Sequence, residues 1–117
     1  MNIVVVDDSR TILSMVSYIL SNKGHQVVCL SSAEQAIEYL TTNTTELLIT
    51  DINMPGMGGH NLITKLKTQE AYKNLPIIVN STKRNSNELN GLVNVWISKP
   101  LNADKLLKAI EQAYADQ

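Results

Sequence analysis

The sequence predicts an α/β protein with a parallel sheet, and three features of the chain support that class. Five short apolar runs recur along the 117 residues. Apolar residues at helical spacing separate most of these runs, a pattern typical of repeated strand–helix units. The runs are continuously apolar and rich in valine and isoleucine, as expected of strands buried on both faces. The predicted strands are residues 3–6, 27–30, 47–50, 77–80 and 95–98.

Two helices are predicted in the first half of the chain. Val16 and Leu20 belong to an apolar stripe at helical spacing that ends near Gly24, a common helix terminator. Ser32 and Gln35 form a capping-box pattern, which indicates that the second helix begins there. Each helix is expected to bury one stripe against the sheet.

Two further helices follow in the second half. Apolar residues at helical spacing around residues 62–66 indicate a third helix. Asn102 is a favourable N-cap for the last helix of the chain. The predicted buried face of that last helix comprises Leu106, Leu107, Ile110 and Tyr114.

The connection between the fourth and fifth strands is the weak part of the pattern. Residues 82–94 give it thirteen positions, close to the dozen that a parallel crossover needs. Residues 85–90 are rich in asparagine and serine, which have low helix propensity. A short or partly unwound fourth helix with above-average mobility is therefore expected.

Size and composition exclude several classes of function. A chain of 117 residues fits one domain, so residues 1–117 are expected to form a single unit without an output domain. The net charge of −1 gives none of the positive field that direct nucleic-acid binding requires. No apolar run is long enough for a membrane span. Cys29 is the single cysteine, expected to be buried on the second strand, and a cytoplasmic location is expected.

Polar residues stand at the carboxyl ends of four predicted strands. Asp7 and Asp8 follow the first strand, Asp51 follows the third, and Ser81 and Lys99 end the fourth and fifth. Carboxyl ends of parallel strands meet at one edge of the sheet, where ligands bind in open α/β folds. These five side chains are therefore expected to form one site.

The expected site has the composition of a magnesium-dependent phosphoryl acceptor. Clustered carboxylates repel one another unless a cation neutralises them, and oxygen ligands suit Mg²⁺. An aspartate can attack phosphorus and form an acyl phosphate, and Asp51 is best placed to do so. The three phosphoryl oxygens then need separate stabilisers, for which Mg²⁺, Lys99 and Ser81 are the candidates.

Three motifs resemble the response regulator receiver family, and the resemblance covers essentially the whole chain. They are Val-Val-Val-Asp-Asp-Ser-Arg at residues 4–10, Ile-Thr-Asp-Ile-Asn-Met-Pro-Gly-Met-Gly-Gly at residues 49–59, and Lys99-Pro100. The resemblance implies a flavodoxin-like (βα)5 three-layer sandwich with sheet order 2-1-3-4-5. It also implies a cis peptide bond between Lys99 and Pro100.

The resemblance also implies roles for individual residues in phosphorylation. Asp51 matches the phosphoacceptor, and Asp7 and Asp8 match the acidic pair that binds Mg²⁺. Asn53 matches the residue that gives its backbone carbonyl to the metal. Lys99 matches the lysine that binds the phosphoryl group.

A conformational switch is implied in the same way. Ser81 matches the hydroxyl residue that moves toward the phosphate, and Trp96 matches the aromatic residue that then turns inward. The shortened connection between the strands alters the usual output and dimer face of the family. Thr82 and Gly58 stand where alanine and aspartate are common.

The implied function is that of a phosphoacceptor in a two-component phosphorelay, similar to the chemotaxis type. The expected partners are a sensor histidine kinase or phosphotransfer protein, and a downstream target protein. The chain would catalyse its own phosphorylation and dephosphorylation, as a monomer or a phosphorylation-dependent dimer. The alternatives are a small aspartate-nucleophile phosphatase, for which no cap segment is evident, and a non-phosphorylated pseudo-receiver that only binds partners.

Overall fold

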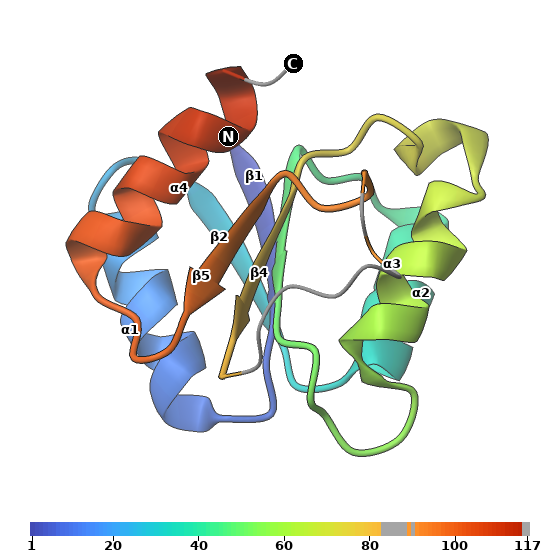
Figure 1. The fold of residues 1–117 in the computed structure, drawn as a ribbon, viewed down its shortest axis with the longest axis horizontal. Helices are drawn as coiled ribbons and strands as arrows, with labels where there is room; N and C mark the ends of the chain where they lie inside the picture. Colours follow the sequence, from blue (N-terminus) through green and yellow to red (C-terminus); the bar gives the residue numbers. More distant parts are fainter. Residues whose placement is uncertain (83–88, 90, 116–117) are drawn as a thin grey trace.

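The computed structural model describes residues 1–82, 89 and 91–115, and these form three layers (Figure 1). The middle layer is a parallel sheet of five strands in the order β2-β1-β3-β4-β5. This order confirms the predicted flavodoxin-like class. The strands are β1 Asn2–Val6, β2 Gln26–Leu30, β3 Leu47–Thr50, β4 Ile77–Ser81 and β5 Val95–Ser98, each within one residue of its prediction at either end.

Helices cover both faces of the sheet. On one face lie α1, Arg10–Ser21, and α4, Ala103–Ala115 (Figure 1). The opposite face carries α2, Ala33–Thr42, and α3, Gly58–Lys67, followed by the 3-10 helix η1, Glu70–Tyr72. The described residues therefore contain four α-helices, and α4 is the helix predicted to follow Asn102.

Alternation along the central strands divides the core into two halves. Ile3 and Val5 of β1 pack on the α1 and α4 side, whereas Val4 and Val6 pack on the α2 and α3 side. All four side chains are buried, because a strand between two helical layers meets apolar side chains on both faces. The sheet therefore fixes the position of the residues that follow its strands.

Side-chain caps explain where the helices begin. The hydroxyl of Ser9 accepts a hydrogen bond from the backbone N–H of Ile12 and so caps the start of α1. This cap was not predicted from the sequence. Ser32 caps α2 as predicted, by accepting from Gln35 N–H. The Gln35 side chain does not return to Ser32, however, and its oxygen accepts from Ser31 N–H instead, at 2.9 Å.

Two predicted burials are wrong. Tyr114 of α4 is 37% exposed, and its hydroxyl donates to the carbonyl of Glu46 at 2.8 Å. Ala109 and Ala113 supply the buried face in its place. Cys29 is exposed because β2 is an edge strand, so one side of that strand lacks a covering neighbour.

The connection between β4 and β5 is described only at its ends and at Leu89. No α-helix occurs in the described part, which comprises Thr82, Leu89 and residues 91–94. The expected short helix otherwise falls on residues 83–88 and 90, which lie outside the described residues. Leu89 is buried, and Leu92 and Val93 pack against the same core on the α3 side.

None of the helices in the described part of the chain combines the length and the apolar character that crossing a membrane requires.

Candidate functional site

Three carboxylates gather at the carboxyl-end edge of the sheet. Asp7 continues β1 and Asp51 continues β3, and the N–H of Asp51 donates to the carbonyl of Val6 at 3.1 Å. One carboxylate oxygen each from Asp7, Asp8 and Asp51 lies within 4.8 Å of the others. Asp7 and Asp51 are buried, while Asp8 is exposed. The adjacency of β1 and β3 thus produces the predicted cluster.

Lys99 bridges the two buried carboxylates from the end of β5. Its Nζ lies 3.0 Å from Asp51 Oδ2 and 3.4 Å from Asp7 Oδ2. Burial by itself would lower the pKa of Lys99, but the hydrogen bond to Asp51 and the charges of both aspartates outweigh it and raise the pKa. The ammonium therefore stays charged where it can meet an anion.

The pKa of Asp7 is raised as well, but for a carboxyl group this shift disfavours the charged form. Burial raises the pKa of its carboxyl group, and the charge of Asp51 adds to that effect. The N–H of Ser9, which donates to Asp7 Oδ1 at 2.9 Å, and the charge of Lys99 oppose the shift without cancelling it. Lys99 and the Ser9 N–H together therefore do not offset what burial and Asp51 cost the ionised form of Asp7.

The two oxygens of Asp51 have different environments. Oδ1 accepts hydrogen bonds from the N–H groups of Ile52 at 2.7 Å and Asn53 at 3.2 Å. Oδ2 faces Lys99. The backbone of the loop after β3 thus fixes the carboxylate, and the N–H group of Asn53, the predicted metal ligand, contacts it directly.

The loop from residue 52 to residue 57 is held from two sides. Met54 is buried in the core on the α2 and α3 side of the sheet and anchors the loop there. From α2, Glu34 Oε2 accepts a hydrogen bond from Met57 N–H at 3.3 Å, and it lies against Gly56, where a Cβ atom would overlap it. Gly56 also has a φ of +82°, a conformation that glycine adopts without strain.

Gly59 is a packing position beside Asp51 that the sequence reasoning missed. A Cβ atom at this residue would overlap the backbone carbonyl of Asp51, so only glycine lets α3 approach so closely. Its N–H donates to the carbonyl of Ile52 at 3.0 Å. Glycine pairs such as Gly58-Gly59 can be noticed in a sequence, but the close approach depends on tertiary packing.

Ser81 and Trp96 lie on neighbouring strands, Ser81 at the carboxyl end of β4 and Trp96 near the start of β5. Ser81 is fully buried at the end of β4, and its carbonyl accepts the backbone N–H of Lys99 at 3.0 Å. Trp96 pairs with Val79 in the β4–β5 register and is half-buried against the core on the α2 and α3 side. The predicted cis bond between Lys99 and Pro100 is confirmed.

The donor set of this edge fits a magnesium ion. Three carboxylates face one ammonium, which leaves two negative charges uncompensated when all three are ionised. Carboxylate oxygens are the ligands that Mg²⁺ prefers, and it commonly keeps water and a phosphate oxygen as further ligands. Asp7, Asp8 and Asp51 are therefore suited to hold such an ion.

Comparison with known proteins agrees with this geometry. The family model of the response regulator receiver domain matches residues 3–111. A chemotaxis protein CheY homolog of Campylobacter jejuni is 35% identical, over 95% of this chain and 90% of its own. CheY1 of Helicobacter pylori is 35% identical, over 95% and 94%. The structure of CheY4 of Vibrio cholerae superposes with a TM-score of 0.90 and 28% identity, over 96% and 97%.

Proposed function

The chain belongs to the response regulator receiver domain family, and from this premise we propose that Asp51 is its phosphoacceptor. Receiver domains are the phosphoacceptors of two-component systems, so a histidine kinase or phosphotransfer protein supplies the phosphoryl group. The observation that carries the assignment is the contact of 3.0 Å between Lys99 Nζ and Asp51 Oδ2 at the centre of the carboxylate cluster.

In the proposed reaction, a carboxylate oxygen of Asp51 attacks the phosphorus of a phosphohistidine. The new P–O bond forms as the P–N bond breaks, and the electron pair of that bond leaves with the imidazole. Oδ2 is the nucleophile that the contacts favour, because the N–H groups of Ile52 and Asn53 hold Oδ1. Lys99 then donates to a phosphoryl oxygen, in place of its contact with Oδ2.

Asp7, Asp8 and Asp51, with the backbone carbonyl of Asn53, are the residues that would hold Mg²⁺. When bound, the ion neutralises charge that develops on the transferred phosphoryl group. The raised pKa of Asp7 supports this assignment, since an adjacent cation would favour its ionised form. Asp8 is exposed, so it can contribute an oxygen without disturbing the core.

The signal is proposed to leave the site through Ser81 and Lys99. The backbone hydrogen bond from Lys99 N–H to the Ser81 carbonyl ties the ends of β4 and β5 together. A phosphoryl group that draws the Lys99 ammonium and the Ser81 hydroxyl toward Asp51 would therefore displace both strand ends. Trp96, half-buried on β5 and paired with Val79 before this junction, is the proposed aromatic element of the switch.

We further propose that the protein works in chemotaxis-type signalling in the cytoplasm and that phosphorylation changes its binding to a downstream protein. The similarity to the CheY proteins of Campylobacter jejuni and Helicobacter pylori, along nearly the whole length of those chains, supports the chemotaxis type. The unpaired thiol of Cys29 fits a reducing compartment.

Intact-protein mass spectrometry tests the phosphoacceptor. Incubation with a small-molecule phosphodonor and Mg²⁺ should add one phosphoryl group to the chain, and Asp51→Asn should remove that gain. A mass gain that persists in Asp51→Asn would place the phosphoacceptor elsewhere. Catalytic release of phosphate from a phosphomonoester, without a modified chain, would favour a phosphatase, and no gain at all would favour a pseudo-receiver.

A further inference from the structure

A cavity of about 460 Å³ opens at the end of the sheet opposite to the carboxylate cluster. One wall is the loop that leads into β4, and the other is the segment of residues 91–94 that leads into β5. Because the strands are parallel, both walls lie at the amino ends of the strands. Its volume falls within the range of sites for small molecules. We call it the amino-end pocket.

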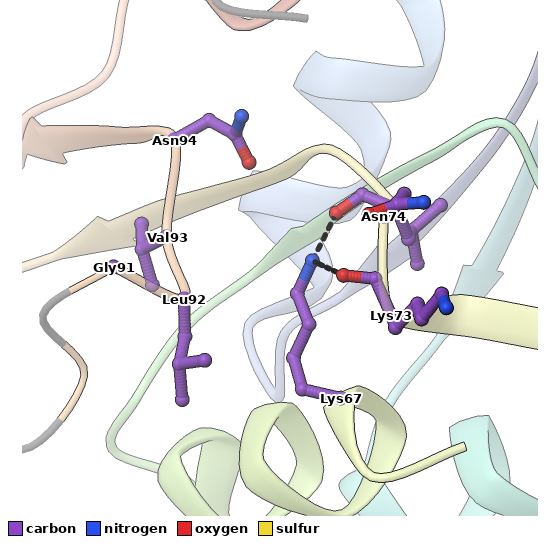
Figure 2. Close-up of a pocket in the computed structure, with 8 residues that line it drawn as sticks. Lys67, Lys73, Asn74, Gly91, Leu92, Val93 and Asn94 are labelled. Carbon is purple, nitrogen blue, oxygen red and sulfur yellow. Dashed lines mark hydrogen bonds between the residues drawn. The ribbon is translucent and has the colours of Figure 1, made fainter. Parts of the chain in front are cut away.

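The walls of the amino-end pocket carry donors and no acid. Lys67, Lys73, Asn74 and Asn94 line it, and no carboxylate occurs among its described lining residues. Leu92 and Val93 add an apolar patch to the same wall as Asn94, as Figure 2 shows. A pocket of this composition is complementary to an anion that carries a small apolar part.

Lys67 reaches into the pocket from the last turn of α3. Its ammonium donates to the carbonyls of Lys73 at 3.3 Å and Leu75 at 2.6 Å (Figure 2). An ammonium has three N–H bonds, and the third has no acceptor among the described residues. Burial lowers the pKa of Lys67, and no carboxylate among the described residues offsets that effect. The side chain is therefore held in place with one N–H group, and with a charge that no described residue compensates, available to a ligand.

Asn94 presents a second donor whose orientation is fixed. The side-chain Oδ1 of Asn94 accepts a hydrogen bond from the backbone N–H of Ile77 at 2.9 Å. The backbone N–H of Asn94 donates to the Ile77 carbonyl, also at 2.9 Å. The first contact identifies the oxygen of the amide, so the NH₂ group is the part left without a protein acceptor in the described chain. Asn74 carries another amide without a hydrogen-bond partner among these residues.

Lys73 makes a smaller contribution. Its Nζ lies 2.7 Å from Glu70 Oε1 in an exposed pair, so its charge is largely compensated. Lys67 and Asn94 are therefore the principal donors.

We propose that the amino-end pocket binds a small organic oxyanion, a carboxylate or a phosphate ester, through Lys67 and Asn94. The apolar part of the ligand would lie on Leu92 and Val93. The bound anion would contact the segment that enters β5, the strand that carries Trp96 and ends next to Lys99. The pocket is thus a second ligand site, separate from the proposed phosphoacceptor and independent of that assignment.

Titration followed by amide NMR spectra tests the site. Acetate and inorganic phosphate are the two probes, with sodium chloride at matched ionic strength as the reference, and the two arms show which oxyanion is preferred. We expect saturable shifts at Asn74, Val93 and Asn94 with a dissociation constant of about 1–10 mM. Shifts confined to the surroundings of Asp51 and Lys99, or no saturation beyond the chloride reference, would overturn the proposal.

Three variants identify the donors. Lys67→Gln should weaken binding about tenfold, the loss expected for one charged hydrogen bond. Asn94→Asp keeps the oxygen that accepts Ile77 N–H but replaces the donor by a negative charge, and it should weaken binding at least as much. Lys65→Gln is the matched control, because Lys65 is an exposed lysine of the same helix that does not line the pocket.

The control decides between a built site and general attraction. Binding should be unchanged in Lys65→Gln, and equal weakening in Lys65→Gln and Lys67→Gln would show that only the net charge of this surface matters. Lys67→Arg, which retains the charge and donors, should retain binding. Full-strength binding in a folded Asn94→Asp protein would also contradict the proposal.

Discussion

Two half-buried lysines lie at opposite ends of the same sheet, and their pKa values are shifted in opposite directions. At the carboxyl ends, Lys99 contacts two carboxylates and its pKa is raised. At the amino ends, Lys67 contacts two carbonyls and its pKa is lowered. Burial lowers the pKa of both, so the charge of the partners decides the sign. Lys99 is therefore a cation fixed by carboxylates, whereas Lys67 lies among neutral dipoles and has no counter-ion within the described part of the chain.

The largest expected effect tests how the backbone places Asp51 beside Lys99. In Gly59→Ala the new Cβ atom would overlap the Asp51 carbonyl, so the unfolding free energy should fall by about 3 kcal/mol. Urea unfolding followed by circular dichroism measures it. Gly24→Ala is the control, because nothing lies within 4 Å of a Cβ there and only its φ of +87° is unfavourable, at about 1 kcal/mol. Equal losses would show that the contact with Asp51 is unimportant.

Replacing each lysine by methionine compares how much its contacts contribute to the unfolding free energy. Lys99→Met leaves two buried carboxylates without their cation, so the unfolding free energy without magnesium should fall by about 3 kcal/mol. Lys67→Met removes only donors to carbonyls and should cost about 1 kcal/mol. Unfolding experiments with added magnesium should recover part of the loss in Lys99→Met and none in Lys67→Met. A larger loss for Lys67→Met would reverse the comparison.

A third test concerns the surplus of negative charge around Lys99. Asp8 is exposed, so Asp8→Asn should leave stability almost unchanged but weaken magnesium binding about tenfold. Isothermal titration calorimetry with MgCl₂ gives the affinity directly. Unchanged affinity in the variant would remove Asp8 from the proposed ligands, and Asp104→Asn on α4 serves as the exposed control.

The smallest effect is the pH dependence of Lys67. Its pKa is lower in the folded chain, so the unfolded chain binds the proton more tightly. The stability of the protein relative to Lys67→Met should therefore rise with pH, between the lowered folded pKa and the unfolded value of about 10.4. Denaturation midpoints measured for both proteins across alkaline pH give this difference. A difference that falls with pH would indicate a raised pKa and an unrecognised anionic neighbour.

Local sequence patterns were sufficient to predict the site at the carboxyl ends of the strands but not the amino-end pocket. Continuous apolar runs located the strands, and the parallel-sheet rule then brought Asp7, Asp51 and Lys99 to one edge. The amino-end pocket has no such pattern, because it arises where the loop after α3 meets residues 91–94. Only the fold brings Lys67 near Asn94. The exposure of Cys29 was missed for a different reason: the implied sheet order already placed β2 at an edge, but the burial of Cys29 was predicted from the apolar character of the strand alone.

The strand order has a consequence for how the chain acquires its charges during synthesis. β1 and β3 are neighbours in the centre of the sheet, so the contact between Asp7 and Asp51 depends only on strands from the first half of the chain. Lys99 is translated much later, at the end of β5. A nascent chain that paired its first three strands before β5 was made would therefore hold two adjacent carboxylates with no lysine between them. In that state a divalent cation from the surroundings would be the available counter-charge.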